Sequence, residues 1–348
     1  MIICFHVFLL SAHSSEVLSS KNASCFASST CVSNKILAMM LSPDDAMLEF
    51  SERILAMRHK EETAYKNVDY LSPEWQQKCL LNEQAMSPFS GSSASSSLIN
   101  EMWREKICEW CYQVVDHFDF NREIVSVAMS YLDRYLATRT VTKKIFQLAA
   151  MTSLYVAIKL YEPSKLRMSA LIDLSRGYFA AEHIVSMEDS LLQALGWHVH
   201  PPTPFSFVRD LAQLLPPEIA TSIRHDASEL ARFLTELSVC DYYFVTRKHS
   251  SVAIAALINA IDINHDIRSN PFVKAQFLNN LMNVGIDISH DQEVADCYTR
   301  LRDMYIAGGY APNLEGEEEP SQRIATVSPV SVFDSPYEEH NPSGSGCQ

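Results

Sequence analysis

The chain has 348 residues, 47% of them hydrophobic, and a formal net charge of −14. This length allows two domains of ordinary size with tails. The acidic balance argues against nucleic acid or an anionic membrane as the main partner, because both bind basic surfaces. Nine cysteines are scattered without a framework spacing, which suits free thiols in a reducing compartment.

Sequence motifs that would indicate catalysis or cofactor binding are missing. The chain has only nine glycines, and they form no G-x-G-x-x-G or P-loop pattern. Neither G-x-S-x-G nor His-Glu-x-x-His occurs, and no pair of acids stands in an apolar setting. The sequence therefore predicts no cofactor and offers no catalytic residue, although missing motifs alone do not exclude an enzyme.

Two short patterns could in principle bind a metal. Cys108-Glu-Trp-Cys111 is a C-x-x-C, which could be a redox pair or half of a zinc site. No second C-x-x-C exists and the next cysteine is Cys240, so we interpret both cysteines as ordinary helix residues. His198-Val-His200 has no third carboxylate or cysteine nearby, and we predict no metal there.

Residues 13–38 show no helical period, and we expect residues 1–41 to form a disordered leader. The first twelve residues resemble the apolar core of a signal peptide, but they lack a basic segment and contain His6. We favour an unstructured leader, or an upstream extension ahead of a start at Met39 or Met40.

Residues 42–97 are predicted to hold two helices and a Ser-rich linker. Ser42 can cap a helix, Pro43 suits its first position, and apolar residues then recur at helical spacing to about residue 65. Ser72-Pro73 opens a shorter helix to about residue 84. A flexible Ser-rich linker follows.

Residues 98–200 carry five segments of helical period and no alternating strand pattern. The predicted helices span 98–117, 121–137, 142–161, 168–175 and 180–195. The third contains Ile145–Tyr161, which is apolar on nearly every side and has no glycine or proline. Such a helix is usually buried, so we expect it to be the central helix of a bundle.

Residues 201–311 carry a second helical set, predicted over 204–215, 217–239, 249–263, 271–284 and 291–307. Its third helix, like that of the first set, consists mainly of small and apolar residues. This indicates a weak internal repeat of two five-helix bundles in tandem. The predicted fold class is therefore all-α. Residues 312–348 are rich in Glu, Ser and Pro and predict an acidic disordered tail, in which Ser328-Pro329 and Ser335-Pro336 are weak phosphorylation candidates.

Four charged residues stand on apolar helices. Arg104 and Asp133 would suit each other, because a charge that faces a core needs a partner. The alternative is that each is solvated, with Arg134 covering Asp133. For Lys159 and Glu188, the residues alone favour two solvated surface charges.

Five segments, in order, resemble the cyclin box between about Trp103 and Val208. They are Trp103–Trp110, Ser130–Leu136, Leu154–Glu162, Ile184–Trp197 and Pro202–Val208. The resemblance implies two tandem five-helix cyclin folds preceded by an N-terminal helix. It also implies a non-catalytic regulatory subunit that binds and activates a cyclin-dependent Ser/Thr protein kinase in cell-cycle control, with that kinase's substrates and inhibitors as further partners.

The resemblance also implies roles for individual residues. It assigns Lys159 and Glu188 to the kinase interface, and Arg104 with Asp133 to a buried structural ion pair. The expected neighbours at the kinase interface are Val156, Leu160, Glu162, Leu192 and Trp197. A substrate-docking patch maps onto Trp103, Ile107, Trp110 and Gln147, with Gln113 in place of the family's acid.

Three other functions remain open at this stage. They are a transcription-type cyclin, a TFIIB-like DNA-binding adaptor, against which the acidic charge speaks, and a helical scaffold without a kinase partner. The Pro201-Pro-Thr-Pro204 junction leans towards D-like cyclins, and the missing Arg-x-x-Leu pattern weakens a mitotic assignment. We expect the protein in the nucleus and cytoplasm.

Overall fold

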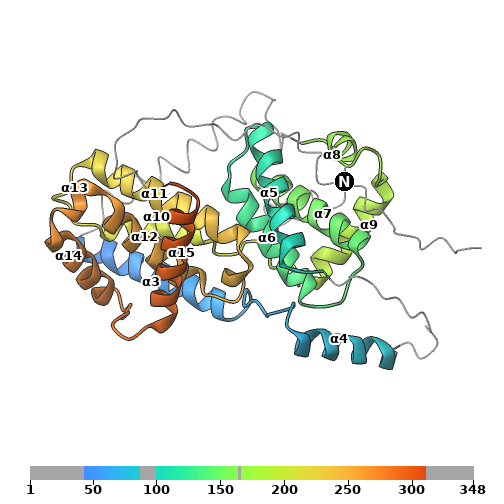
Figure 1. Ribbon diagram of the computed structural model, residues 1–348, viewed down its shortest axis with the longest axis horizontal. Helices are drawn as coiled ribbons and strands as arrows, with labels where there is room; N and C mark the ends of the chain where they lie inside the picture. Colours follow the sequence, from blue (N-terminus) through green and yellow to red (C-terminus); the bar gives the residue numbers. More distant parts are fainter. Residues whose placement is uncertain (1–42, 87–98, 164–165, 311–348) are drawn as a thin grey trace, which may run out of the picture. The chain divides into compact units, whose positions relative to one another are not determined.

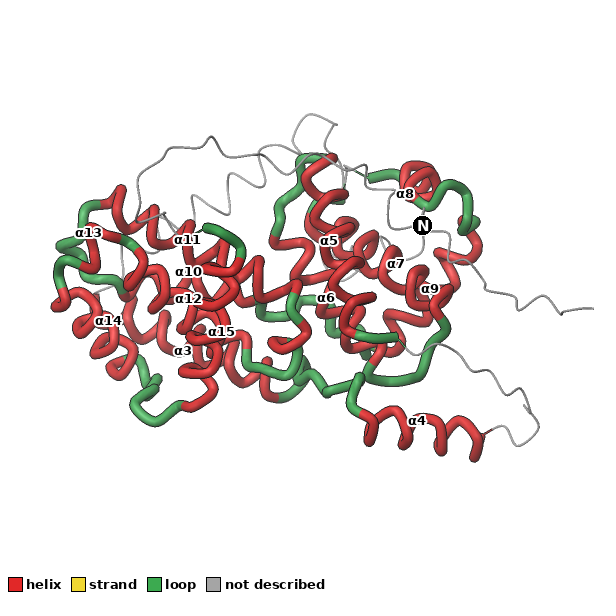
Figure 2. Tube along the Cα trace, viewed as in Figure 1, coloured by secondary structure: helices red, strands yellow, loops and turns green. Residues whose placement is uncertain are grey.

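The computed structural model describes residues 43–86, 99–163 and 166–310, and throughout these ranges the regular structure is helical (Figure 2). This confirms the predicted all-α class. The predicted leader, the Ser-rich linker and the acidic tail lie outside the described residues. The chain divides into two compact units, residues 1–53 and 54–348. The described part of the first unit is the beginning of α3 (Pro43–Glu62).

The first five-helix set consists of α5 (Glu101–His117), α6 (Glu123–Leu136), α7 (Lys143–Tyr161), α8 (Met168–Leu174) and α9 (Ala181–Ala194) (Figure 1). Helix α7 packs against α5, α6 and α9. Its residues from Leu148 to Ile158 are all buried. The predicted central helix is therefore confirmed, and α4 (Pro73–Met86) precedes the set in the chain.

The second set consists of α10 (Pro204–Leu211), α11 (Thr221–Cys240), α12 (His249–Ile263), α14 (Pro271–Asn283) and α15 (Gln292–Ala307). Helix α12 packs against α10, α11 and α15, and its residues from Ser250 to Ile261 are buried. It therefore has the central place that α7 has in the first set, as the weak internal repeat predicts.

Three short elements depart from the sequence prediction. The segment predicted as one helix over 204–215 continues after α10 as the 3₁₀ turn η1 (Ala212–Leu214). Two others were not predicted: the 3₁₀ turn η2 (Tyr242–Phe244) and α13 (His265–Arg268). Single turns are too short to show an apolar period, although Asn264, which accepts hydrogen bonds from two amides of α13, is a recognisable cap.

Capping side chains set the first residues of several helices. Asn100 accepts a hydrogen bond from the Trp103 amide at 3.1 Å, so α5 begins at Glu101 rather than at residue 98. Thr203 accepts from the Ser206 amide at 3.0 Å, and Pro204 occupies the first turn of α10. The first residues of α5 and α10 therefore follow from local sequence.

A buried ion pair in the first helical set also contacts the second set through its arginine. The Arg104 guanidinium on α5 donates from Nε and Nη2 to the two carboxylate oxygens of Asp133 on α6, both at 2.9 Å. Each residue is 3% exposed. Arg104 Nη1 also donates to the carbonyl of Val239, at 2.8 Å, near the end of α11. One side chain therefore ties α5, α6 and the second set together.

Tyr70, in the segment between α3 and α4, completes this network. Its hydroxyl donates to Asp133 Oδ1 at 2.8 Å, and its ring packs edge-on against Tyr242. Burial, and then the charge of Asp133, raise the pKa of Tyr70 well above its ordinary value, so the phenol stays a donor. Burial alone would lower the pKa of Arg104, but the Asp133 carboxylate raises it above its ordinary value.

Replacing Asp133 with Asn should destabilise the chain by about 3–5 kcal/mol, because Arg104 would remain as a buried charge without a counter-charge. Urea unfolding followed by circular dichroism measures this free energy. Asp116→Asn is the matched control, since the Asp116 side chain is 52% exposed in its pair with Arg122 and should contribute about 0–1 kcal/mol. Equal effects of the two substitutions would contradict the structural role of the Arg104–Asp133 pair.

Candidate functional site

Lys159 and Glu188 lie together on the first helical set. The Lys159 Nζ atom, near the end of α7, is 2.6 Å from Glu188 Oε1 on α9. The Lys159 side chain is 27% exposed and that of Glu188 9% exposed. Lys159 Nζ also lies 5.2 Å from the centroid of the Tyr155 ring, one turn earlier on α7. The alternative of two unrelated solvated charges is therefore wrong.

The other residues assigned to this face differ in exposure. Val156 and Leu192 are buried, at 3% and 4% exposed, on the same two helices as the ion pair. Leu160 and Glu162 are half-buried at the end of α7. Trp197, beyond the end of α9, is 59% exposed. The face therefore combines an ion pair that partly reaches solvent with apolar neighbours and one exposed indole.

The backbone holds Trp197 in an unusual conformation. Gly196 and Trp197 have φ values of 57° and 63°, in the left-handed region that bulky residues rarely adopt. Arg134 on α6 fixes this turn by donating to the carbonyls of Leu195 and His198, at 2.9 and 2.8 Å. The suggestion that Arg134 covers Asp133 is therefore wrong. A strained, exposed tryptophan on a fixed turn is typical of a binding surface.

The predicted substrate-docking patch needs correction. Ile107 and Trp110 are 1% and 0% exposed, so neither can contact another protein from the surface. Both lie on the same face of α5 as Trp103, and that face packs against α7. Trp103, at the first turn of α5, and Gln147, on α7, are only half-buried. The apolar period of α5 therefore marks mainly core and not an exposed patch.

The remaining sequence patterns show no metal geometry. Cys108 and Cys111 are buried on α5, and His200 packs its ring against Tyr161, with centroids 6.0 Å apart. Among the described residues, no three His, Cys, Asp or Glu side chains gather as a metal site would require. Of the helices in ranges 43–86, 99–163 and 166–310, none is long and apolar enough to cross a membrane.

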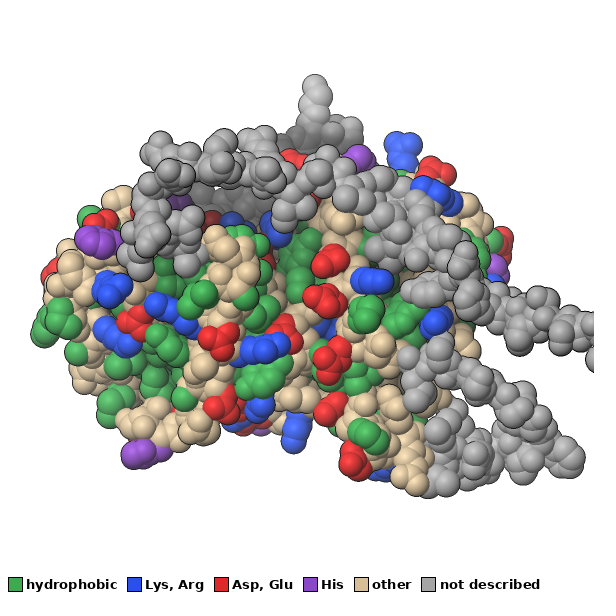
Figure 3. Space-filling view, viewed as in Figure 1, with side chains coloured by type: hydrophobic (Ala, Val, Ile, Leu, Met, Phe, Trp, Pro, Cys, Tyr) green, Lys and Arg blue, Asp and Glu red, His purple; other side chains and the backbone are tan. Residues whose placement is uncertain are grey.

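Charge on the surface is mixed. On the face drawn in Figure 3, Asp and Glu side chains are interspersed with Lys and Arg among apolar side chains. The arrangement around Lys159 contains neither a nucleophile paired with a base nor two carboxylates facing each other.

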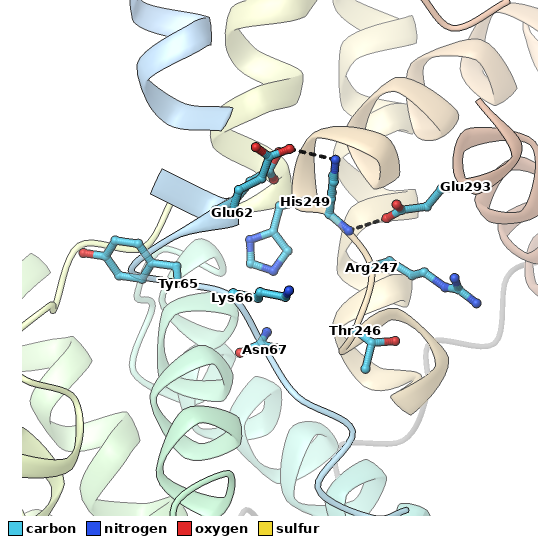
Figure 4. A pocket seen from close by; sticks show the side chains of 10 residues that line it. Glu62, Tyr65, Lys66, Asn67, Thr246, Arg247, His249 and Glu293 are labelled. Atoms are coloured by element: carbon cyan, nitrogen blue, oxygen red, sulfur yellow. Dashed lines mark hydrogen bonds and ion pairs between the residues drawn. The ribbon is translucent and has the colours of Figure 1, made fainter. Parts of the chain in front are cut away.

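A cavity of about 350 Å³ was not predicted from the sequence. It lies between the segment from Glu61 to Asn67 and the start of α12, with Glu293 of α15 on one side (Figure 4). Lys248 Nζ contacts Glu62 Oε1 at 2.7 Å, and the Lys248 amide donates to Glu293. These charged side chains attach the N-terminal segment to the second helical set.

Glu61 is the buried anchor of this segment, at 6% exposed. It accepts hydrogen bonds from the amide of Ser250, at 2.9 Å, and from the Ser250 hydroxyl. Its carboxylate therefore caps the N-terminus of α12 from another part of the chain. Burial raises the pKa of Glu61 above the ordinary 4.5, although the bonds from Ser250 partly oppose that shift.

Comparison with known proteins assigns the family. The family model for the cyclin N-terminal domain matches residues 56–200, and that for the cyclin C-terminal domain matches residues 202–314. Together the two models span most of the chain. The chain therefore belongs to the cyclin family, and the all-helical tandem fold described above is the cyclin fold.

Individual curated relatives share about 30% sequence identity or less with this chain. The chain is 30% identical over 163 residues to "G2/mitotic-specific cyclin-2" of Antirrhinum majus, covering 47% of this chain and 36% of that protein. It is 27% identical over 230 residues to "G2/mitotic-specific cyclin S13-6" of Glycine max, covering 66% of this chain and 46% of that protein. The chain thus spans less than half the length of these two curated relatives.

A solved structure of a viral cyclin from herpesvirus saimiri is also similar. It has a TM-score of 0.48 and 17% sequence identity, and the match covers 66% of this chain and 99% of that one.

Replacing Glu188 with Gln should lower the free energy of unfolding by only about 1 kcal/mol, because Lys159 can turn to water when its partner loses charge. Urea unfolding measures this, with Asp133→Asn as the comparison. A loss as large as that of Asp133→Asn would mean that the Lys159–Glu188 pair holds the fold, and a separate binding role would lose its support.

Replacing Glu61 with Gln should flatten the pH dependence of stability above about pH 4.5. The folded-state pKa of Glu61 lies above its unfolded value. Its stabilising contribution is therefore complete below the unfolded pKa and is lost as the pH rises through the folded pKa. Urea midpoints measured from about pH 4.5 to about pH 7 test this.

Glu62→Gln is the matched control for Glu61→Gln. A hydrogen bond from Lys248, and then its charge, lower the pKa of the exposed Glu62 carboxyl. The contribution of Glu62 is present above its unfolded pKa and is lost as the pH falls through the folded pKa. Similar pH profiles for the two variants would contradict the assignment of Glu61 as the buried anchor.

Proposed function

We propose that this cyclin is a regulatory subunit that binds and activates a cyclin-dependent Ser/Thr protein kinase in cell-cycle control. The observation that carries the proposal is the Lys159–Glu188 ion pair, closed at 2.6 Å yet still partly open to solvent. Water can be excluded from such a pair when a partner covers the surrounding apolar side chains, which is the pattern of a binding hot spot. The names of the relatives, G2/mitotic-specific cyclins, support the cell-cycle role.

In the proposed mechanism the chain supplies no catalytic group. It binds one conformation of the kinase better than the other, and the kinase population shifts towards the favoured one. Active protein kinases need a particular helix, which carries a glutamate, in place beside the nucleotide site. We propose that the Lys159 face contacts this helix and holds it inward, and that Trp197 extends the contact.

The finer assignments remain proposals. We propose action in the nucleus and cytoplasm, with the substrates and inhibitors of the kinase as additional partners. The Pro201–Pro204 junction favours a D-like cyclin, and this stays a prediction. The relatives reported above are instead named as G2/mitotic-specific cyclins. The transcription-type cyclin is the alternative within the family. The TFIIB-like adaptor, from a different functional class, also stays open.

Replacing Lys159 with Glu should abolish kinase capture. Tagged wild-type chain, incubated with lysate from synchronised cells of its own organism, should recover a protein kinase identified by mass spectrometry and by its phosphorylation activity. The reversal places a negative charge beside Glu188 and should weaken capture by at least about 30-fold, since a hot-spot residue contributes about 2 kcal/mol or more. Lys144→Glu, an equal charge change at an exposed site on α7, is the control.

The double variant Lys159→Glu/Glu188→Lys separates two explanations for such a loss. If it fails to restore capture, the lysine itself contacts the kinase, as proposed. If it restores capture fully, the pair acts only within this chain and the interface assignment is wrong. Capture that is equal for wild type and Lys159→Glu would also contradict the proposal. Salt-sensitive retention of DNA would instead favour the TFIIB-like adaptor.

A further inference from the structure

Two cysteines from different helical sets face each other where the two cyclin folds meet. The Sγ atom of Cys108, on α5, lies 3.3 Å from the Sγ atom of Cys240, the last residue of α11. Cys108 is fully buried, whereas Cys240 is half-buried. A disulfide needs its sulfur atoms about 2.0 Å apart, so an approach of about 1.3 Å would form the bond.

We propose that Cys108 and Cys240 form a reversible redox modification site, which takes a hydroperoxide as oxidant and covalently links the two cyclin folds. This inference is independent of the proposed kinase function. It revises the interpretation of Cys108 as an ordinary helix residue, because its partner is Cys240, from the second fold, and not Cys111 of the same C-x-x-C.

The half-buried Cys240 is the residue that the oxidant can reach first. Its sulfur attacks the peroxide O–O bond, giving a sulfenic acid and one molecule of water from hydrogen peroxide. The Cys108 sulfur then attacks the sulfenic sulfur, and the departing hydroxide takes the Cys108 proton and leaves as the second water. Two thiols thus lose two electrons in total, which reduce the peroxide.

The surroundings favour this order of events. Burial raises the pKa of the Cys108 thiol well above its ordinary value, so Cys108 is protected from direct oxidation. The Arg104 charge acts in the opposite direction and would stabilise the negative charge that develops on Cys108 during its attack. Arg104 Nη1 also donates to the Cys240 carbonyl at 3.3 Å, which holds the end of α11 near α5.

The bond would reinforce the contacts that already join the folds. Arg122, before α6, contacts Glu236 of α11 at 2.8 Å, and the Tyr112 hydroxyl donates to the Glu236 carbonyl. All these contacts are polar, and a covalent link beside them would couple the unfolding of one fold to that of the other. The bond would close the loop of chain between Cys108 and Cys240. A closed loop restricts the conformations of the unfolded chain, which raises the free energy of unfolding.

The test is peptide mapping of the purified full chain after treatment with hydrogen peroxide, alkylation of the remaining thiols and digestion with trypsin. Cleavage after Lys106 and Arg122 releases peptide 107–122, and cleavage after Arg232 and Arg247 releases peptide 233–247, in which Cys240 is the only cysteine. The expected product is these two peptides joined, and it should disappear on treatment with dithiothreitol. Oxidation at Cys79 reports that the peroxide acted.

Single cysteine-to-serine variants identify which sulfur atoms form the bond. The joined peptide should persist in Cys111→Ser, the matched control, and be lost in Cys108→Ser and in Cys240→Ser. If Cys108→Ser, which changes a fully buried site, fails to fold, fragmentation of the joined wild-type peptide by mass spectrometry shows whether the bond is at Cys108 or at Cys111. Absence of the product while Cys79 is oxidised, or its persistence in Cys108→Ser, would overturn the proposal.

Thermal unfolding tests the consequence of the link. The peroxide-treated wild type should unfold at a higher midpoint than the same sample after reduction, and Cys240→Ser should show no such difference. A joined peptide without any change in the midpoint would overturn the inference that the bond couples the two folds.

Discussion

The junction of the two cyclin folds depends on the buried pair of Arg104 and Asp133. Both charged partners are buried, so neither can be removed without leaving the other charge uncompensated. Arg104 Nη1 also donates a hydrogen bond to the Val239 carbonyl at the end of α11. Asp133 in turn accepts a hydrogen bond from the Tyr70 hydroxyl. The ion pair therefore connects α5, α6, α11 and the segment before α4.

The second ion pair on the first fold has a different physical character. Lys159 and Glu188 are as close as Arg104 and Asp133, but the lysine side chain is 27% exposed to solvent. An ion pair that keeps part of its hydration contributes little to folding. It can contribute more when a partner removes the remaining water, because charges interact more strongly in a medium of lower dielectric constant. Exposure thus separates the structural pair from the pair that we propose to bind the kinase.

The N-terminal segment and the cysteine pair show how much of this structure is decided between the folds. Glu61 caps α12, Tyr70 contacts Asp133, and Cys108 faces Cys240. These contacts join residues that are far apart in the chain, and most are polar rather than apolar. A junction of this kind contains groups that can take up a proton or be oxidised, which a purely apolar interface would not.

The sequence by itself determined the longer helices and the central place of α7 and α12, and it offered Arg104 and Asp133 as candidate partners. Apolar period, caps and prolines act within a few residues, so they can be interpreted without knowing the fold. Only the tertiary structure decided that Ile107 and Trp110 are core, that Glu61 and Tyr70 attach the N-terminal segment, and that Cys240 meets Cys108. The reason is that an apolar face does not reveal whether another helix or solvent covers it, and contacts across long stretches of chain depend on packing.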